Sequence, residues 1–563
     1  MHNLHAPGFY EDIVIGKKTI QGRFVIPSGI RCAHASAIER YFGIASIGMI
    51  TTKSVSLEPR AGYKEPLYVR YAENSYLNAV GLANPGAKAF AEELSKIVVP
   101  ANKFLLVSIF GKDADDFLRT AELLAPYADG FELNMSCPHA KGFGLSIGSD
   151  AALVTRITRA IAERFDVPVF VKLSSVIPNA AGLAGAAIEN GALGLAVTNS
   201  IGPTIEYVAG VPVLSNVVGG MSGEAIRPMG LKLLGDIRKV IGPQPPVIGM
   251  GGIFTKEHVE SYNTAGADFF GIGSALTNLD TQETQAYLDS LQADLIHQTN
   301  TYTLPPVTNM DYRACVVEKN EALTDVLHKI TVSQWSGYDT DSDVAGKFFF
   351  LMIPGVGEKP FALFSHHDRE FIVKNVGFFT NALAGLSPGD TLFVRGPYGK
   401  GVWDYQGVTV NFVAGGTGIS PVYEIAKKYS GACNIRFFLG GKVKGDIFAP
   451  ERFAALGEVH AATEDGSVGA SGYVTGLLEA YDFDGDSTQV FINVGPKPML
   501  EKCYAIEKKL AGDENIKVSI EYQTSCGVGI CGKCASESGF ISCLDGPFLG
   551  IEEAMTIREC RHG

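Results

Sequence analysis

Residues 104–138 read FLLVSIFGKDADDFLRTAELLAPYADGFELNMSCP and contain three patterns in succession. Residues 104–111 form a short apolar run, residues 115–128 repeat apolar side chains with a helical period, and residues 130–138 begin a second apolar run. Strand, helix and strand in this order form the unit of a parallel sheet, because the helix returns the chain to the edge where the first strand began. The stretch therefore predicts an α/β fold.

Eight such apolar runs occur between residues 20 and 295, mostly separated by helical patterns such as residues 150–166 and 228–242. The runs are RFVIPSG, IGMITTKS, FLLVSIFG, GFELNMSCP, VPVFVKLS, LGLAVTNS, PPVIGMGG and DFFGIGSAL. Eight parallel strands with helices between them predict a (β/α)8 barrel, which we expect over residues 1–300. Chemically capable residues gather near the C-terminal ends of the runs, where this fold carries its active site. They are Ser28, Lys53, Asn134, Ser136, Cys137, Lys172, Asn199 and Ser200.

The last two runs end in the glycine-rich segments GMGGI (249–253) and GIGSAL (271–276). Glycine lets backbone N–H groups approach a phosphate closely, and barrels commonly bind phosphate after strands seven and eight. Tight turns would also explain glycine pairs. Their place after two consecutive late strands favours a phosphate site.

Seven segments of this half occur in order: TKSVSLEPRAGYKEP, NAVGLANPG, ELNMSCPHAKGFG, VKLS, VTNSIG, GGMSGEAIRPMGL and GMGGI with GIGSAL. Together they resemble the FMN-containing class 1 dihydroorotate dehydrogenases. The resemblance implies FMN at Ser28, Gly29, Lys53, Ser54, Lys172, Asn199, Gly223, Gly251, Gly252, Gly273 and Ser274. It implies a pyrimidine held by Asn78, Val80, Gly81, Leu82, Asn134, His139, Asn199 and Ser200.

Cys137 takes the role of catalytic base under this resemblance, removing a proton from dihydroorotate while FMN accepts hydride. A thiol in an enclosed polar site near a lysine can have the lowered pKa that this role requires. The alternative is an inert buried thiol.

His139 departs from the family, which usually has asparagine after SCP. Dihydropyrimidine dehydrogenases carry NxSCPH, so dihydrouracil or dihydrothymine is an alternative substrate.

The second half begins after a polar, proline-containing linker that we place at residues 301–310. Frequent turns and β-rich runs predict a β-barrel over residues 311–405. VTVNFVAGGTGISPVYEIAKKY (408–429) then reads as strand, glycine loop and helix, which is typical of a nucleotide-binding α/β domain, expected over residues 406–515.

KPFALFS, KNVGFFTNAL, GPYGKGV, VAGGTGISP, TEDGSVGASGYVTGLL and VGPKPML resemble ferredoxin-reductase-like flavoproteins, and most of all the electron-transfer subunit of NAD-linked dihydroorotate dehydrogenases. This implies FAD at Lys359, Pro360, Phe361, Lys374, Gly377 and Thr380. It implies NAD at Gly415, Gly416, Gly418, Asp465 and Gly466, with Gly495, Pro496 and Met499 alongside. Lys359 stands where the family has arginine and Ala362 where it has serine, and Val494 replaces the cysteine of the CGP motif.

Four cysteines, Cys526, Cys531, Cys534 and Cys543, lie in TSCGVGICGKCASESGFISCLDG. The first three have the C-x4-C-x2-C spacing of plant-type [2Fe–2S] proteins, and Gly527, Gly529, Gly532 and Gly539 allow the tight turns that wrap a cluster. A structural zinc site is the alternative. We expect a cluster domain over residues 516–563.

The two resemblances imply a natural fusion of the catalytic and electron-transfer subunits, oxidising dihydroorotate with NAD+ as electrons pass from FMN through [2Fe–2S] to FAD and NAD. A flavin and iron–sulfur electron-transfer module without pyrimidine chemistry is a further alternative. A net charge of −13 argues against a nucleic-acid or anionic-membrane partner. With no signal-like start or long apolar run, we expect a cytoplasmic protein. Relatives suggest a homodimer through the barrels.

Overall fold

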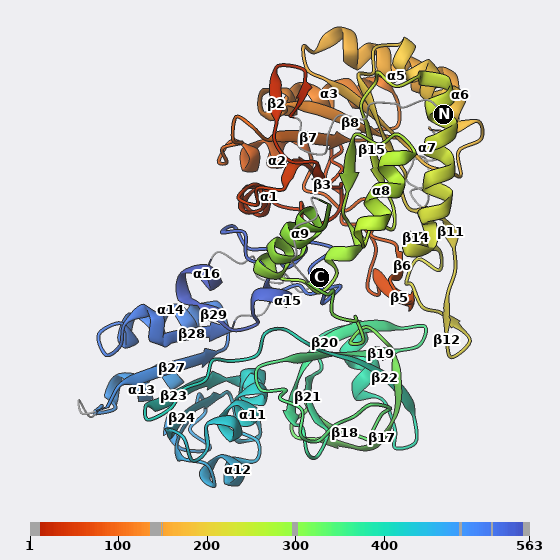
Figure 1. The fold of residues 1–563 in the computed structure, drawn as a ribbon. Helices are drawn as coiled ribbons and strands as arrows, with labels where there is room; N and C mark the ends of the chain where they lie inside the picture. Colours follow the sequence, from red (N-terminus) through yellow and green to blue (C-terminus); the bar gives the residue numbers. More distant parts are fainter. Residues whose placement is uncertain are drawn as a thin grey trace. The chain divides into compact units, whose positions relative to one another are not determined.

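The computed structural model describes residues 12–135, 148, 150–295, 302–483, 487–519 and 522–555. The chain divides into two compact units (Figure 1). Unit 1 comprises Met1–Thr308 together with Val528–Ala535. Unit 2 comprises Asn309–Gly527 and Ser536–Gly563. A short piece of the C-terminal cysteine segment therefore belongs to the first unit.

A closed parallel barrel forms the centre of unit 1, in the order β10-β15-β16-β3-β4-β7-β8-β9. Its strands are β3 (Phe24–Ile26), β4 (Ile47–Thr51), β7 (Phe104–Ile109), β8 (Gly130–Asn134), β9 (Val169–Leu173), β10 (Gly194–Val197), β15 (Val247–Met250) and β16 (Phe269–Gly271). Phe270 of β16 pairs with Phe24 of β3, which closes the ring. These are the eight apolar runs of the sequence, so the predicted barrel is confirmed. Their near-continuous burial fits strands covered on both faces.

Helices lie around the strands of this barrel (Figure 1). They are α1 (Ala35–Phe42), α2 (Ala87–Leu94), α3 (Ala114–Leu124), α5 (Ala151–Arg164), α6 (Ala180–Glu189), α7 (Arg227–Ile241), α8 (Lys256–Thr264) and α9 (Thr281–Leu295). The helix predicted in the opening stretch is α3, which starts where the Asp113 carboxylate accepts the N–H of Asp116 at 3.0 Å. The helices predicted near residues 150–166 and 228–242 are α5 and α7.

A short antiparallel hairpin precedes the barrel, formed by β1 (Ile13–Ile15) and β2 (Lys18–Ile20). Ile15 and Ile20 pack in one apolar cluster with Phe104 and Phe170. Phe104 is the first residue of β7, and Phe170 is the second residue of β9. The hairpin therefore covers the end of the barrel where the strands begin. The polar residues predicted for the site lie at the opposite end, where the strands finish.

Two insertions after barrel strands form an antiparallel sheet that the sequence patterns did not predict. Its order is β11 (Ile201–Thr204), β14 (Gly219–Gly223), β6 (Ser75–Asn78) and β5 (Tyr68–Ala72). A two-strand ribbon, β12 (Tyr207–Val208) with β13 (Val211–Pro212), extends from the second insertion. Because Asn78 pairs with Gly220 and Ser75 with Gly223, the sheet joins the loop after β4 to the loop after β10.

Unit 2 begins with a closed antiparallel barrel, as predicted, in the order β17-β18-β21-β20-β19-β22. The strands are β17 (Arg313–Ala322), β18 (Leu327–Val332), β19 (Phe348–Ile353), β20 (Gly357–Ser365), β21 (Glu370–Lys374) and β22 (Thr391–Tyr398), with α10 (Phe378–Ala384) between the last two. Its apolar interior includes Trp335, Phe349 and Phe371.

A seven-stranded sheet follows, in the order β26-β25-β24-β23-β27-β28-β29. The strands are β23 (Thr409–Gly415), β24 (Asn434–Gly441), β25 (Glu458–Thr463), β26 (Ala470–Ser471), β27 (Gln489–Val494), β28 (Ile516–Ser519) and β29 (Leu549–Gly550). The helices are α11 (Ile419–Tyr429), α12 (Pro450–Ala454), α13 (Val474–Ala480), α14 (Lys497–Glu507), α15 (Ser542–Asp545) and α16 (Ile551–Met555). All neighbouring strands are parallel except β28 and β29.

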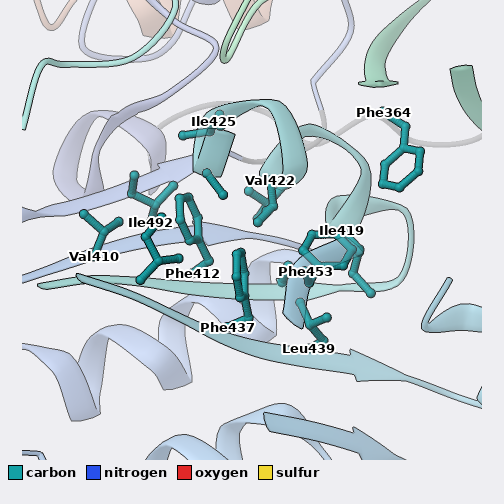
Figure 2. Close-up of a cluster of buried hydrophobic side chains, with 14 of the residues drawn as sticks. Phe364, Val410, Phe412, Ile419, Val422, Ile425, Phe437, Leu439, Phe453 and Ile492 are labelled. Carbon is teal, nitrogen blue, oxygen red and sulfur yellow. The ribbon is translucent and has the colours of Figure 1, made fainter. Parts of the chain in front are cut away.

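Figure 2 shows the apolar core beneath α11. Val422 and Ile425 of α11 meet Phe412 of β23 and Phe437 of β24, whose rings stack at 5.4 Å between centroids. Phe364 of the antiparallel barrel belongs to the same cluster, so the barrel and the sheet share one core. In the part of the chain that the structure describes, no helix has the length and apolar character needed to cross a membrane.

Glu507 ends α14 inside unit 2 and provides a pH-dependent test of this fold. Burial raises the pKa of its carboxyl to about 8, although the Asn493 amide donates a hydrogen bond to it at 2.9 Å. The folded protein therefore holds a proton that the unfolded chain releases above its ordinary pKa of 4.5, so the free energy of unfolding falls as pH rises from there to about 8.

We predict that Glu507→Gln abolishes the fall in the free energy of unfolding between about pH 5 and pH 8. Its stability relative to wild type should grow by roughly 1.4 kcal/mol for each pH unit between about pH 5 and pH 8. Urea unfolding of both proteins across that range measures the difference. Glu501→Gln, which changes an exposed carboxylate on the same helix, is the matched control. Parallel pH profiles for wild type and Glu507→Gln would contradict the prediction.

Candidate active site

The polar residues predicted for the active site follow the C-terminal ends of the barrel strands. Ser28 lies after β3, Lys53 after β4 and Asn199 after β10, while Asn134 and Lys172 lie at the ends of β8 and β9. Because parallel strands end on one face of a barrel, Ser28 and Asn199 lie on the same face although they are 171 positions apart in the sequence.

Ser54 is the centre of a hydrogen-bond network on this face. Its hydroxyl lies 3.1 Å from the Ser28 hydroxyl and 2.8 Å from the Ser108 hydroxyl, and it accepts a hydrogen bond from the Asn134 amide at 2.8 Å. The Asn199 amide donates to the Asn134 side-chain oxygen at 3.4 Å. The backbone N–H of Ser200 donates to the Asn199 side-chain oxygen at 2.8 Å. The structure thus joins five residues predicted from the sequence, through hydrogen bonds that orient their amide groups.

Lys172 forms a buried ion pair that sequence reasoning missed. Its Nζ lies 3.5 Å from Oε1 of Glu132, and the two side chains are 5% and 0% exposed. The Ser108 hydroxyl donates to the same oxygen of Glu132 at 2.8 Å. One signal was readable: Glu132 is a lone acid in an apolar strand run, two positions before Asn134 and so on the same side of β8.

Cys32 lies beside the two lysines of this face. The backbone N–H of Gly29 donates a hydrogen bond to the Cys32 sulfur at 3.2 Å. The backbone N–H of Lys53 donates to the Cys32 carbonyl oxygen at 3.1 Å. Burial raises the pKa of its thiol to about 11, although Lys53 and Lys172 act in the opposite direction. At neutral pH this cysteine therefore remains a thiol.

Asn78, Val80, Gly81 and Leu82 lie at the end of β6 and in the loop that follows. The Asn78 amide donates to the carbonyl of Gly220 at 3.0 Å, across the inserted sheet. Val80 accepts the N–H of Tyr63 at 3.1 Å, and Gly81 has a positive φ of 75°. Neighbouring Leu82 also has a positive φ, of 55°.

Three of the predicted phosphate glycines, Gly223, Gly251 and Gly252, lie close to one another. Gly251 and Gly252 follow β15 with φ angles of +116° and +74°, and Gly223 ends β14 with a φ of +88°. A Cβ at Gly252 would lie 2.7 Å from the carbonyl oxygen of Gly223. Gly273 and Ser274 begin a short helical turn after β16. Such close backbone approach leaves room only for glycine and fits a cradle of N–H groups around phosphate.

Cys137 and His139, the predicted base and a predicted substrate contact, lie outside the described residues.

The segment Val528–Ala535 packs on barrel loops within unit 1. The backbone N–H of Arg31 donates a hydrogen bond to the carbonyl of Ile530 at 3.2 Å. The backbone N–H of Asn278 donates to the carbonyl of Val528 at 3.0 Å. The Arg31 guanidinium in turn binds the carbonyls of Leu276 and Leu279. The segment that contains Cys531 and Cys534 therefore contacts loops that follow the first and last barrel strands.

All four predicted cluster cysteines are buried. The glycines at 527, 529, 532 and 539 have φ angles between +71° and +84°, as the tight-turn prediction requires. Cys526 belongs to unit 2, where its carbonyl accepts a hydrogen bond from the Arg395 guanidinium at 3.1 Å. Among the described residues, no group of three or more His, Cys, Asp or Glu side chains is placed to hold a metal ion. The [2Fe–2S] assignment therefore rests on cysteine spacing alone.

The predicted FAD residues come together on three elements of unit 2. Lys359, Pro360 and Phe361 lie in β20, Lys374 ends the neighbouring β21, and Gly377 and Thr380 are at the start of α10. The Thr380 hydroxyl accepts the N–H groups of Val376 and Gly377, each at 3.0 Å, and the rings of Phe361 and Phe379 lie 6.3 Å apart. Adjacent Phe378 is 73% exposed, so an aromatic ring faces solvent beside these residues.

The predicted NAD glycines connect β23 to α11. A Cβ at Gly418 would lie 2.4 Å from the carbonyl oxygen of Val494, so only glycine fits there. Met499 lies against both Gly415 and Gly495, which brings the two glycine segments together at the ends of β23 and β27. Asp465 and Gly466 are in the turn between β25 and β26, where Asp465 accepts hydrogen bonds from Ser467. These segments form a glycine-lined edge at the C-terminal ends of parallel strands, where α/β sheets bind nucleotides.

Fold and site define unit 1 as a (β/α)8-barrel protein with its polar site at the ends of the strands. The family model for dihydroorotate dehydrogenase matches residues 13–295. Three curated relatives are each named dihydroorotate dehydrogenase B (NAD(+)), catalytic subunit. The chain belongs to the dihydroorotate dehydrogenase family and is an oxidoreductase.

The relative from Methanocaldococcus jannaschii is 36% identical over 45% of this chain and 82% of its own length. The relative from Thermoplasma acidophilum is 39% identical over 45% of this chain and 80% of its own length. The relative from Archaeoglobus fulgidus is 41% identical over 41% of this chain and 76% of its own length. A crystal structure of DHODH from Eimeria tenella in complex with ferulenol aligns with a TM-score of 0.43 and 20% identity, over 53% of this chain and 87% of that one.

We predict that Gly252→Ala destabilises unit 1. The added Cβ would meet the Gly223 carbonyl at 2.7 Å, and a positive φ costs an alanine about 1–2 kcal/mol even in open space. The thermal unfolding midpoint should therefore fall. Gly235→Ala is the matched control, because Gly235 lies within α7 with nothing within 4 Å of its Cβ position. That change should leave the midpoint unchanged or raise it, since alanine favours helix by about 1 kcal/mol. Equal midpoints for the two variants would contradict the predicted strain.

Proposed function

We propose that this chain oxidises dihydroorotate to orotate with FMN bound at the barrel and NAD+ as the final acceptor. One observation carries the proposal: the linked side chains of Ser54, Asn134 and Asn199, together with the buried Lys172, gather where the strands end. Amide groups held by fixed hydrogen bonds suit a pyrimidine ring, which has both donors and acceptors on its edge. The family membership and the named relatives support the same substrate.

The residues of this face fit FMN. Gly223, Gly251, Gly252 and Gly273 would cradle its phosphate, and Lys53 and Lys172 would face its ring. A positive charge beside the ring would favour the electron-rich form of a flavin. When bound, FMN would supply the acceptor for the hydride that leaves the substrate.

The chain itself would bind the pyrimidine, orient it and take up its proton. Asn134 and Asn199, with Asn78 on the inserted sheet, would hold the ring. Cys137 would accept the proton from C5 of dihydroorotate, because the sequence has it three residues after Asn134 at the end of β8. The raised pKa of Cys32 makes that buried thiol a poor candidate for the same role.

We further propose that unit 2 is a fused electron-transfer module. Lys359, Lys374 and the exposed Phe378 would meet FAD, and the glycine-lined edge around Gly415 and Gly418 would meet NAD. Cys526, Cys531, Cys534 and Cys543 would be the cluster ligands by their spacing. The order FMN, [2Fe–2S], FAD and NAD, and a homodimer through the barrels, follow from the resemblance and belong to the proposal.

We predict that the purified full-length protein contains one FMN and one FAD, released by acid and separated by chromatography. It should reduce NAD+ with dihydroorotate at a kcat/KM at least tenfold above that with dihydrouracil or dihydrothymine. Higher turnover of dihydrouracil would overturn the assignment and favour the substrate that the NxSCPH pattern of His139 suggests. Absence of turnover with every pyrimidine, with NADH-dependent dye reduction intact, would favour an electron-transfer module alone.

We predict that Cys137→Ser lowers kcat for dihydroorotate by about 10²-fold or more, because a serine hydroxyl is a far weaker base at neutral pH. The residual rate should rise with pH. NADH-dependent dye reduction measures unit 2 by itself and should remain unchanged. Cys433→Ser is the control, because that cysteine lies in unit 2 and donates to the carbonyl of Tyr405, which a hydroxyl can also do. An unchanged kcat for Cys137→Ser would exclude this residue as the base.

A further inference from the structure

Glu132 is a buried carboxylate beneath the proposed flavin site, and the proposed mechanism has no role for it. It lies on β8, and its partner Lys172 lies on the adjacent strand β9, opposite Asn134. Phe170, two positions before Lys172 on β9, belongs to the apolar cluster inside the barrel, so Lys172 faces the same interior. The Lys172 and Glu132 side chains are 5% and 0% exposed, with 3.5 Å between Nζ and Oε1. Lys172 thus has its counter-charge on the side toward the barrel interior.

The surroundings of Glu132 hold it in one position. Oε1 accepts the Ser108 hydroxyl at 2.8 Å and also faces Lys172, while Oε2 is buried and has no hydrogen-bond partner among the described residues. Ser108 continues to Ser54, which contacts Asn134. The carboxylate is therefore the inner end of a chain of polar groups that leads to the substrate-facing amides.

Stability does not explain this pair well. Removing two charges from water costs about as much as their attraction returns, so buried ion pairs add little net stability over apolar packing. The same low-polarity surroundings make the field of each charge strong over several ångströms. A carboxylate on the interior side of the lysine can therefore reduce the positive electrostatic potential that the ammonium produces on its other side, at the proposed flavin.

We propose that Glu132 is a positioning residue that holds the Lys172 ammonium in place and reduces its positive field at the flavin, so that it sets how strongly the bound flavin accepts negative charge. This rests on the proposed binding of FMN at the barrel. Loss of the carboxylate leaves an uncompensated positive charge. The flavin then accepts negative charge more readily.

Sulfite is the probe for this effect. It adds to the N5 atom of an oxidised flavin through its sulfur lone pair, leaves the ring with a negative charge and bleaches its visible absorbance. Titration of the full-length holoprotein with sulfite therefore reports the stabilisation of negative charge without any substrate turnover. Glu132→Gln, whose amide oxygen can still accept the Ser108 hydroxyl, should lower the sulfite Kd by about tenfold or more, which corresponds to at least about 1.4 kcal/mol.

Two variants separate charge from other effects. Asp129→Asn removes the same charge from a Lys–Asp pair just before β8, where Lys18 lies 2.8 Å away, and should leave the Kd within about threefold of wild type. Ser108→Ala removes the hydroxyl but keeps the ion pair and should also stay within about threefold. A Kd for Glu132→Gln equal to that of wild type, or a Ser108→Ala shift as large as that of Glu132→Gln, would overturn the proposal.

FMN content, measured after acid release, separates this inference from the proposed function. A wild-type protein without FMN would refute the proposed function itself. A wild-type protein that holds FMN, with sulfite binding insensitive to Glu132→Gln, would refute only the inference. Glu132→Met is the second neutral variant and should shift the Kd in the same direction. Loss of FMN from both neutral variants would also overturn the proposal, because the flavin must stay bound to be tuned.

Discussion

Closure of the eight-stranded parallel barrel is the constraint on which the rest of unit 1 depends. The pairing of Phe270 with Phe24 joins the last strand to the first and leaves no open edge. Because the strands of the closed ring are parallel, their C-terminal ends lie on one face, so Ser28, after the first strand, and Ser274, after the last, lie on that same face. The apolar hairpin at Ile15 and Ile20 covers the opposite end, which leaves the polar chemistry on a single face.

The polar groups of the barrel lie at different depths below its C-terminal face. The outermost residues, such as Asn199, follow their strands, while Glu132 and Ser108 lie further in and have no access to solvent. Buried polar groups of this kind must be hydrogen-bonded or paired, because each lost partner costs about 1–3 kcal/mol. The Glu132, Ser108, Ser54 and Asn134 chain meets that demand except at Oε2 of Glu132, and it holds the outer amides in place as a consequence.

The C-terminal cysteine segment is divided between the two units. Its last strand, β29, pairs with β28 at Val518 and Leu549 and so extends the sheet of unit 2. Val528–Ala535 belong to unit 1, through backbone hydrogen bonds to Arg31 and Asn278. Backbone contacts depend little on side-chain identity, so nothing in the letters of this segment pointed to Arg31 as its partner.

The sequence by itself determined the elements of this protein. Apolar runs with helical intervals were sufficient for the eight strands and for α3, α5 and α7, because burial on both faces imposes an uninterrupted apolar pattern. Glycines at 251, 252, 527 and 532 could be assigned to special turns, since their positive φ angles exclude most side chains. Tertiary structure alone decided the pairing of Glu132 with Lys172, the environment of Cys32 and the sheet made by the two insertions. The physical reason is distance along the chain: these contacts join residues on different strands, and one sequence contains no signal for which distant polar groups share a buried space.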